Sequence, residues 1–525
     1  MLRSPLPDVE IPDVSIHDYL FSDLDESTLD SVAIIDGMTG AETTYRQLTA
    51  QIGLFAGALA ARGIGVGDRV GVLCPNVPAF ATVFHGILRA GATATTINSL
   101  YTADEIADQL DDAGAQWLVT VSPLLPGAKA AAQRRGIADD HVIVLDGADG
   151  HPSLRDLLSE GHEAPDVTFD PRTHLAVLPY SSGTTGRPKG VMLTHRNLIA
   201  NVAQCRPVLD VDHTDRVLAV LPFFHIYGMT VLLNFALRQR AGLVTMPKFD
   251  LLEFLRIIAE HRTTWVFVAP PIAVALAKHP VVDDYDLSAV KVIFSGAAPL
   301  DGALAAAVAT RLGCEVVQGY GMTETSPAVN LIPAGHPEID KASIGPLVPN
   351  TEARLVDPET GADVEVPADG VSEPGELWVR GPQVMAGYLN RPEATADILD
   401  DGGWLHTGDI ATASSDGIFR IVDRLKELIK YKGYQVAPAV LEAVLLEHPL
   451  IADAAVIGAN DEDGQEVPRA YVVRQAGTEL SAEEVMDFVA AKVAPHEKVR
   501  QVEFIDSIPK SASGKILRKD LRARA

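Results

Sequence analysis

The segment Tyr180-Ser-Ser-Gly-Thr-Thr-Gly-Arg-Pro-Lys-Gly190 is the most informative part of this chain. It gathers glycines, serines and threonines around a single lysine, directly after the short apolar run Leu175–Leu178. Backbone N–H groups, hydroxyls and a cation in one loop suit the oxygens of a phosphate chain. The spacing differs from that of a Walker loop, because no Gly-Lys-Ser/Thr closes it. A surface linker is the alternative, but linkers rarely lie between a buried strand and a helix start, which Thr194–Leu198 predicts. We therefore predict that this loop binds phosphate.

The size and charge of the chain limit what it can be. A chain of 525 residues is too long for one core, so two or more domains are expected. Hydrophobic residues make up 47% and charged residues 22%, which are ordinary values for a globular protein. The net charge of −27 argues against non-specific binding to nucleic acid or to an anionic membrane. We therefore expect a folded protein of two or more domains, without long disordered tracts.

Cysteine usage and apolar runs bear on the compartment. The cysteines are scattered, lack metal-ligand spacing, and predict buried thiols in a reducing environment. The segment Val217–Leu237 contains no Asp, Glu, Lys or Arg and is long enough for a membrane span of about 20 residues. Pro222, His225 and Gly228 interrupt it, which favours a buried strand, a turn and a core helix. We predict a cytoplasmic protein without stable membrane insertion.

Short β-rich runs alternate with alanine-rich helical stretches through most of the chain. Continuous apolar strands separated by helices predict an α/β fold with doubly wound parallel sheets, covered on both faces. The predicted strands are Arg69–Cys74, Trp117–Val121, His141–Leu145, Arg216–Leu221, Leu243–Met246, Trp265–Val268, Lys291–Phe294 and Glu315–Val317. The predicted helices between them include Ala79–Ala90 and Leu300–Leu312.

The chain changes character after about Thr351, where Pro and Gly become frequent and short alternating runs predict a small antiparallel β subdomain. A domain boundary is expected near Asp423–Lys426, which gives a large domain over residues 1–422 and a small α+β lobe over 423–525. In the small lobe, fifteen Lys and Arg face seventeen Asp and Glu, a net charge of −2 that leaves −25 for the rest. Its lysines are therefore expected to meet something anionic, although chance variation of surface charge would give the same count.

Four further segments could carry chemistry. Ser295-Gly-Ala-Ala-Pro299 keeps its side chains small, so a flat ring or a backbone could approach it. In Gln318-Gly-Tyr-Gly-Met-Thr-Glu-Thr325, the tyrosine could stack on a purine, Thr323 could donate to a phosphate, and Glu324 could hold Mg²⁺. The alternative readings are a plain strand-to-helix turn for the first segment, and a core tyrosine with a solvated glutamate for the second.

The other two segments lie towards the carboxyl end. His406-Thr-Gly-Asp409 offers a carboxylate suited to the two hydroxyls of a ribose. Pro509-Lys-Ser-Ala-Ser-Gly-Lys-Ile516 predicts a mobile loop that carries Lys515 into a site, with a charged terminal tail as the alternative. Each segment alone is ambiguous, but their order and spacing along the chain are informative.

Taken together, these segments resemble the adenylate-forming acyl-CoA synthetase superfamily, from near Thr44 to Arg522. Within it the chain most closely resembles 4-coumarate:CoA ligases. The segments that carry the closer match are Leu221–Tyr227, Ala269–Ile272, Leu425–Pro438 and Ser513–Arg518. The resemblance implies two half-reactions: a carboxylate attacks the α-phosphate of ATP to give an acyl-adenylate, and the thiol of CoA then displaces AMP.

The resemblance also implies roles for individual residues. ATP would be bound by Ser181, Ser182, Gly183, Thr184, Thr185, Lys189, Gln318, Gly319, Tyr320, Thr323, Asp409 and Arg424, with Glu324 on Mg²⁺. Catalytic roles would fall to Lys515, His225, Lys430 and Gln435. The acyl substrate would be bordered by Tyr227, Val231, Ala297 and, at the pivot of the small lobe, Lys426. CoA would contact Lys248, Lys432 and Gly433.

The substrate is the least determined part. Val231 stands where plant-type ligases carry a small polar residue, so it would narrow or dry that wall. The favoured reading is an ATP-, Mg²⁺- and CoA-dependent ligase for 4-coumarate or a related cinnamic acid. A medium- or long-chain fatty acyl-CoA synthetase, an enzyme that loads a carrier protein, and a non-catalytic nucleotide-binding regulator are the alternatives. A homodimer is one assembly that the sequence allows.

Overall fold

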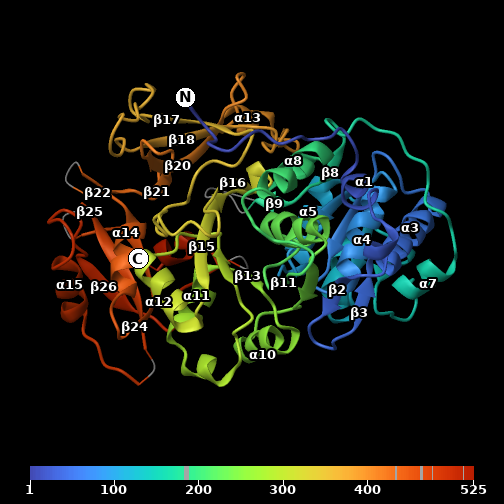
Figure 1. Ribbon diagram of the computed structural model, residues 1–525, viewed down its shortest axis with the longest axis horizontal. Coiled ribbons are helices and arrows are strands. Elements are labelled where there is room, and N and C mark those ends of the chain that lie inside the picture. The colour runs from blue at the N-terminus through green and yellow to red at the C-terminus, as the bar shows by residue number, and fades with distance from the viewer. Residues whose placement is uncertain (182–187, 432–433, 462–464, 476, 512–513, 525) are drawn as a thin grey trace.

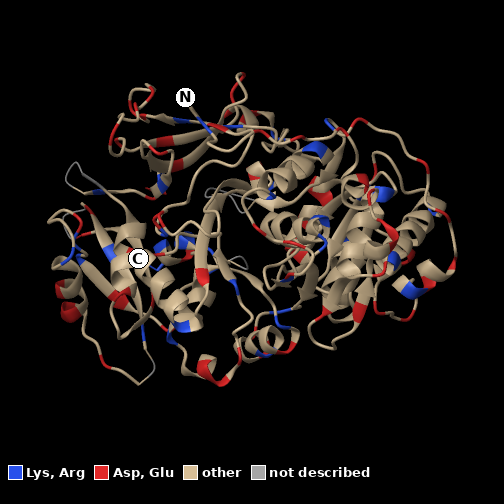
Figure 2. Ribbon diagram, viewed as in Figure 1, with Lys and Arg blue, Asp and Glu red and all other residues tan. Residues whose placement is uncertain are grey.

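The computed structural model describes residues 1–181, 188–431, 434–461, 465–475, 477–511 and 514–524. Figure 1 shows a large body, a small β subdomain above it, and a C-terminal lobe beside both. The body and the subdomain share one continuous hydrophobic core, whereas residues from Ile429 to Val499 form a core of their own. Acidic residues are spread over helices and loops of the whole molecule (Figure 2).

The body contains two mixed sheets that are parallel in their middle. The first has the order β19-β10-β8-β5-β4-β6-β7, with β9 paired to β10. The bounds are β4 Arg69–Leu73, β5 Thr93–Thr96, β6 Trp117–Thr120, β7 Val142–Val144, β8 Leu175–Val177, β9 Tyr180–Ser181, β10 Lys189–Thr194 and β19 Gly387–Tyr388. β4 to β8 run parallel, and β10 and β19 close this edge antiparallel.

The second sheet has the order β16-β15-β14-β13-β11-β12-β2-β3. The bounds are β2 Val32–Asp36, β3 Glu42–Thr44, β11 Arg216–Ala219, β12 Gly242–Thr245, β13 Trp265–Val268, β14 Val292–Ser295, β15 Glu315–Gly321 and β16 Ala328–Leu331. Its interior strands are parallel, and the edge strands β3 and β16 are antiparallel. The predicted α/β fold with doubly wound sheets is confirmed, with antiparallel strands added at the edges.

Helices cover these sheets (Figure 1). The longer ones are α3 Tyr45–Ala61, α4 Pro78–Arg89, α5 Ala103–Ala113, α6 Leu125–Arg135, α8 His195–Cys205, α10 Leu251–His261, α11 Pro270–Lys278 and α12 Gly302–Leu312. The shorter ones are α1 Ile16–Phe21, α2 Glu26–Leu29, α7 Leu154–Ser159, α9 Phe235–Gln239 and α13 Pro392–Ala396, with 3₁₀ turns at η1 Ser122–Leu124, η2 Asp139–His141, η4 Pro280–Asp284 and η5 Thr323–Thr325. Several begin with a side-chain cap, such as the Thr194 hydroxyl that accepts from Asn197 N at the start of α8.

The β subdomain is antiparallel, as predicted, and it recruits the N-terminus. Its order is β1-β17-β18-β20-β21, so the first strand of the chain pairs with a strand about 350 residues away. The bounds are β1 Leu2–Arg3, β17 Glu352–Val356, β18 Gly375–Arg380, β20 Leu405–Ala413 and β21 Phe419–Arg424. The strip formed by β20 and β21 leads directly into the C-terminal lobe.

The C-terminal lobe is α+β, also as predicted. It comprises β22 Ile429–Tyr431, β23 Tyr434–Val436, α14 Pro438–Leu446, β24 Ile451–Asn460, β25 Glu466–Arg474, α15 Ala482–Ala490, β26 Gln501–Phe504 and α16 Arg518–Arg522. The lobe contacts the body through Lys278, whose Nζ donates to the carbonyls of Leu446 (3.2 Å) and Ile451 (3.1 Å). It therefore docks on α11 without sharing the core of the body.

Two local predictions are corrected. Lys189–Thr194 forms strand β10, so the predicted phosphate loop connects two antiparallel strands and does not directly precede helix α8. Within Val217–Leu237, the predicted core helix begins as a π-helix, η3 Tyr227–Asn234, before α9. Among the described residues, no helix has both the length and the apolar character needed to cross a membrane.

Candidate nucleotide and acyl site

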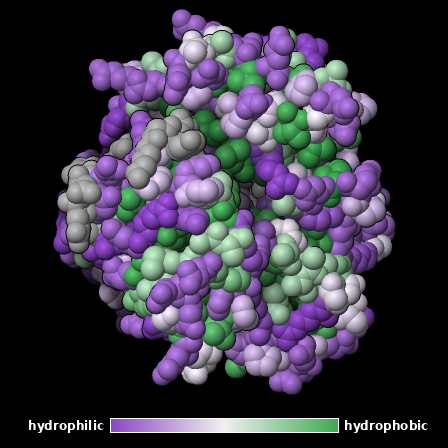
Figure 3. Space-filling view, turned by 90° about the vertical axis from the view of Figure 1, so that its left-hand side faces the viewer, coloured by the Kyte–Doolittle hydropathy of each residue, from purple (hydrophilic) through white to green (hydrophobic). Residues whose placement is uncertain are grey.

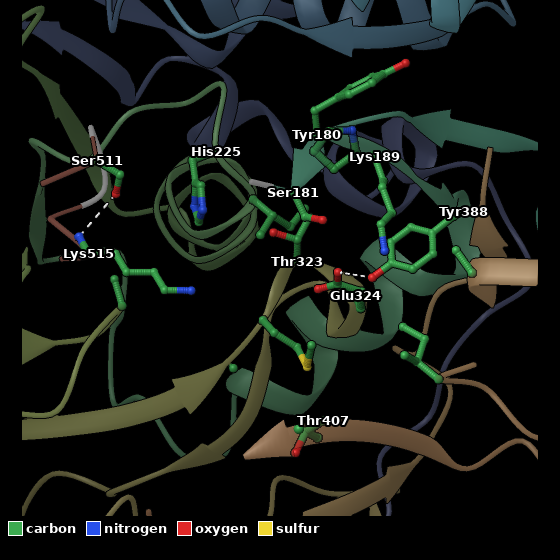
Figure 4. A pocket seen from close by; sticks show the side chains of 18 of the residues that line it. Tyr180, Ser181, Lys189, His225, Thr323, Glu324, Tyr388, Thr407, Ser511 and Lys515 are labelled. Atoms are coloured by element: carbon green, nitrogen blue, oxygen red, sulfur yellow. Dashed lines mark hydrogen bonds between the residues drawn. The ribbon is translucent and has the colours of Figure 1, made fainter. Parts of the chain in front are cut away.

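A cavity of about 720 Å³ lies where the body, the β subdomain and the C-terminal lobe meet. Residues from all three parts line it, among them Ser181, Lys189, Thr323, Arg424 and Lys515. Figure 3, turned towards the C-terminal lobe, shows a mostly hydrophilic face that is hollowed near its centre. The close view in Figure 4 shows the side chains of Lys189, Glu324 and Tyr388 grouped together, with Lys515 extending into the cavity from the other side. Segments far apart in the chain therefore converge on one polar space.

One end of the cavity holds the base of the predicted phosphate loop. Ser181 and Lys189 lie opposite each other where β9 pairs with β10. Ser182, Gly183, Thr184 and Thr185 lie outside the described residues. The Lys189 ammonium sits over the ring of Tyr388, with Nζ 4.5 Å from the ring centroid. A cation is thus present at the mouth of the loop, close to the carboxylate of Glu324 (Figure 4).

Thr323 and Glu324 form the 3₁₀ turn η5 on the floor of this end, and both are buried. The turn is held by Thr325, whose side chain bonds the backbone of Met322, and by Met385 N, which donates to the Glu324 carbonyl at 2.9 Å. The Tyr388 hydroxyl donates to Oε1 of Glu324 at 2.6 Å. A carboxylate held in this way next to a phosphate loop is suited to a hard cation.

A second polar group lies at the strip between β15 and β20. The Tyr320 hydroxyl donates to Oδ2 of Asp409 at 2.6 Å, and Arg424 Nε lies 3.3 Å from Oδ1 of the same carboxylate. Glu376 accepts from Gly408 N (3.0 Å) and so fixes the turn that carries Asp409. The structure therefore groups an aromatic ring, a carboxylate and a guanidinium that were predicted to bind a nucleoside.

Gln318 and Gly319 do not line this cavity as predicted. The Gln318 side chain is buried and is bonded to the backbone of Leu300 and Lys341, so it supports the strand-to-helix turn there. Gln318, Gly319 and Tyr320 all belong to β15, where the prediction ended the strand at Val317. Gly319 instead borders the smaller apolar pocket described below.

Lys515 reaches the cavity from the C-terminal lobe. Lys515 N donates to Oγ of Ser511 at 3.2 Å and closes the loop. Gly514 packs against Ala269 of the body, because a Cβ added to Gly514 would lie only 2.9 Å from the Ala269 Cβ. The side chain extends into the space shared with His225 (Figure 4). Burial first, and then the charge of Arg424, lower the pKa of Lys515 from 10.5 to about 8.

His225 lies between this cavity and the apolar pocket and lines both. Burial, followed by the charge of Lys515, lowers the pKa of His225 to about 4, so the ring is neutral at pH 7. Its Nδ1 accepts a hydrogen bond from Tyr227 N at 3.3 Å. The proton therefore resides on Nε2, which makes that nitrogen a donor.

The apolar pocket adjoins His225 and is lined by the predicted residues Tyr227, Val231 and Ala297, together with Phe294, Gly296, Gly319, Met322, Pro327, Ala328 and Leu331. Tyr227 and Val231 project from the π-helix η3. Gly296 allows the Tyr227 ring to lie close, because an added Cβ would come within 2.7 Å of the ring. The Tyr227 hydroxyl is buried, and it has no hydrogen-bond partner among the described residues.

Several predicted residues lie outside both spaces. Lys430 is exposed on β22, where its backbone N donates to Glu466 Oε2 at 2.9 Å, and Lys248 is exposed on the body. Gln435 pairs with Lys430 through the backbone of the β22–β23 hairpin. Lys432 and Gly433 lie outside the described residues. Lys426 is exposed but borders the main cavity. Among the described residues, the structure thus brings most of those predicted for ATP and the acid together, with Gln318 as an exception, and places Lys248 on the surface of the body.

Sequence reasoning missed Tyr388 and Glu376, which both line the main cavity. Each acts on a predicted site residue, Tyr388 on Glu324 and Glu376 on the turn before Asp409. Their short surroundings, Gly387-Tyr388 and Gly375-Glu376, are ordinary strand sequences. The signal that could have found them is a pairing between distant segments, which a single sequence does not contain.

Comparison with known proteins agrees with this geometry. Residues 22–389 match the sequence profile described as AMP-binding enzyme, and residues 440–515 match that of the AMP-binding enzyme C-terminal domain. The 4-coumarate--CoA ligase 1 of Solanum tuberosum is 43% identical over 535 residues, which cover 100% of this chain and 96% of that protein. The anthranilate CoA ligase AuaEII in complex with anthranoyl-AMP is similar in structure, with a TM-score of 0.89 at 27% identity and coverage of 100% and 99%. ATP-bound MatB from Rhodopseudomonas palustris has a TM-score of 0.87 at 29% identity, covering 98% of this chain and 99% of that one.

Proposed function

The chain belongs to the AMP-binding enzyme family, and from this premise we propose that it is an AMP-forming acid:CoA ligase for 4-coumarate or a related cinnamic acid. The observation that carries the proposal is the position of Lys515. Its side chain enters a cavity lined by His225, Thr323 and Arg424, next to an apolar pocket that His225 also lines. The Lys515 ammonium lies near where the polar cavity joins the apolar pocket. The carboxylate of an acid bound in the pocket would meet the α-phosphate of ATP there.

In the first half-reaction, a carboxylate oxygen attacks the α-phosphorus, and the bond to the pyrophosphate oxygen breaks. Two anions approach each other, so cations and donors must lie at the developing charge. The Lys515 ammonium and the Nε2–H of His225 supply this charge and this donor, because both border the space between the polar cavity and the apolar pocket. Thr323 would donate to the α-phosphate, and Lys189 to the outer phosphates.

The donor set at Glu324 fits Mg²⁺. Among the described residues no group of three or more His, Cys, Asp or Glu is arranged around a metal position, so Glu324 would be a single protein ligand. Mg²⁺ is commonly held by one or two carboxylates, with substrate phosphates and water completing its coordination. When bound, the ion neutralises phosphate charge and orients the leaving pyrophosphate. Asp409 and Arg424 would hold the ribose on the other side of the cavity.

In the second half-reaction, the sulfur of CoA attacks the acyl carbonyl, and the carboxyl–phosphate bond breaks to release AMP. We propose that residues 423–525 act as a mobile lobe, with Lys426 at its pivot. Lys430 is exposed in the present arrangement and does not line the cavity that Lys515 enters. A turn of the lobe would exchange Lys515 for the β22–β23 hairpin and bring CoA to Lys248, Lys432 and Gly433.

The acyl pocket favours a hydroxylated aromatic acid. It is mostly apolar, and among its polar groups the Tyr227 hydroxyl has no partner among the described residues. A buried hydroxyl without a hydrogen bond costs about 1–3 kcal/mol, which a phenolic substrate would recover. An aliphatic chain would leave this cost in place. The pocket therefore supports 4-coumarate over a fatty acid.

Exchange of labelled pyrophosphate into ATP, measured with a panel of acids, tests the proposal. 4-Coumarate should drive exchange faster than octanoate or palmitate, and the product with CoA should be the thioester. Faster exchange with the fatty acids would instead favour a fatty acyl-CoA synthetase. Thioester formation on a phosphopantetheinyl carrier without CoA would favour a carrier-loading enzyme, and failure to bind ATP would exclude all three.

A further inference from the structure

Tyr388 contacts two opposite charges in the phosphate end of the cavity. Its ring lies under the Lys189 ammonium, with Nζ 4.5 Å from the centroid, and its hydroxyl donates to Glu324 Oε1 at 2.6 Å. Figure 4 shows the three side chains together. One side chain thus contacts the cation through its π face and the carboxylate through its hydroxyl.

The backbone around Tyr388 holds it rigidly to both neighbours. Leu389 N donates to the Gly190 carbonyl (2.8 Å) and Ala386 N to the Met192 carbonyl (3.0 Å), so β19 is fixed to the strand that begins with Lys189. On the other side, Met385 N donates to the carbonyl of Glu324 itself at 2.9 Å. The segment that carries Tyr388 therefore spans the strand of the cation and the turn of the carboxylate.

Tyr388 gives each of the two charges a contact within the protein. A lysine and a glutamate in a partly buried cavity attract each other strongly, because the effective dielectric constant there is lower than in water. A direct ion pair would occupy the groups that ATP and its metal ion need. With Tyr388 in contact with both, the ammonium lies on an aromatic face and the carboxylate keeps its second oxygen towards the cavity (Figure 4).

We propose that Tyr388 is a positioning residue for the metal-binding carboxylate Glu324, and that its ring holds the Lys189 ammonium until Mg·ATP arrives. This inference rests on the proposed function, since it takes the cavity to bind ATP. Hydrogen bonds that orient a metal-binding carboxylate commonly change metal affinity about 10–100-fold when they are removed. The role concerns the metal and the outer phosphates, and leaves the adenosine and α-phosphate contacts unchanged.

The test compares Tyr388→Phe and Tyr388→Leu with the wild type by calorimetric titration. Three titrants are used: ATP with excess Mg²⁺, ATP with EDTA, and AMP. Tyr388→Phe should weaken Mg·ATP binding about 10-fold, and raise the Mg²⁺ concentration that gives half-maximal ATP binding by a similar factor. Binding of AMP and of metal-free ATP should stay the same. Tyr388→Leu also removes the ring, so Mg·ATP binding should fall further.

The matched control is Tyr45→Phe, which deletes another buried hydroxyl of the body, one that donates to the Leu237 carbonyl. It should leave all three affinities at the wild-type value. Equal weakening of AMP and Mg·ATP in Tyr388→Phe would show a merely structural role and overturn the inference, as would an unchanged Mg²⁺ requirement. A wild-type protein that binds no ATP at all would instead refute the proposed function.

Discussion

At the nucleotide end of the cavity most polar groups already have partners in the protein, whereas the acyl pocket is apolar and buries one hydroxyl without a partner. Asp409 is held by Tyr320 and Arg424, and Glu324 is held by Tyr388. The Tyr227 ring, by contrast, is positioned by its packing against Gly296 and by the π-helix that carries it. The first region is organised before a ligand arrives, and the second leaves its polar contact to the ligand.

The difference follows from what each region must bind. A nucleotide always presents the same ribose and phosphates, so its site can be assembled in advance by charged groups that are paired within the protein. The acid is recognised mainly by shape and burial, to which many residue types can contribute. Changes at the nucleotide end should therefore affect every acid alike, whereas changes in the acyl pocket should separate one acid from another.

Lys515→Ala should give the largest effect and should not discriminate between acids. Removing the ammonium is expected to lower ATP–pyrophosphate exchange about 10²–10³-fold for every acid, because charge stabilisation in the cavity is lost. Thioester formation from supplied acyl-AMP should be spared. The control is Lys510→Ala, a lysine of the same loop that pairs with Asp453 instead. Equal loss in both half-reactions would contradict the role assigned to Lys515.

Gly296→Ala should act on the acyl pocket alone. The added Cβ would meet the Tyr227 ring at 2.7 Å. Overpacking of this kind costs about 1–3 kcal/mol, so kcat/KM for 4-coumarate should fall about 10–100-fold. AMP affinity, measured by calorimetry, should not change. Gly53→Ala, where an added Cβ meets nothing within 4 Å, is the matched control. Joint loss of AMP binding would show that the two regions are not separate.

Tyr227→Phe should change the selectivity between acids, with little effect on kcat/KM for cinnamate. The hydroxyl that we propose for the phenolic substrate is lost, so kcat/KM for 4-coumarate should fall by about 5–30-fold relative to that for cinnamate. Competition between the two acids in one reaction measures this ratio directly. An unchanged ratio would place the substrate's hydroxyl elsewhere in the pocket.

The smallest expected effect is an uptake of protons when ATP binds. Burial holds the pKa of Lys515 at about 8 in the absence of ligand, so the side chain is mostly neutral at pH 8.5. Phosphates raise that pKa, and binding at pH 8.5 should therefore take up between about 0.5 and 0.8 proton. At pH 6.5 the lysine is already charged and the uptake should vanish. Calorimetry in buffers of different ionisation enthalpy measures it, and Lys515→Met should abolish it at pH 8.5.

Much of the fold could be predicted from local patterns. Apolar runs such as Trp265–Val268 became central parallel strands, because a strand buried on both faces must be apolar throughout. The boundaries were less accurate. β15 continues from Val317 to Gly321 because β16 pairs with its end, and this pairing partner lies beyond any local window. The strand β10 was likewise missed, since its partners β8 and β19 come from distant segments.

The same division holds for the site. The sequence was enough to predict which residue types would bind phosphate and ribose, because few residue types suit those groups. These predictions concern the phosphate loop, Thr323-Glu324, Asp409 and Lys515. Other features depend on which distant segments pack together. These are the convergence of the site residues, the hydrogen bond from Tyr388 to Glu324, the hydrogen bonds of Gln318 to backbone, and the lack of a partner for the Tyr227 hydroxyl among the described residues. The types of the functional residues can be read from short segments of the sequence, whereas the hydrogen-bond partners and burial of each side chain depend on the whole folded chain.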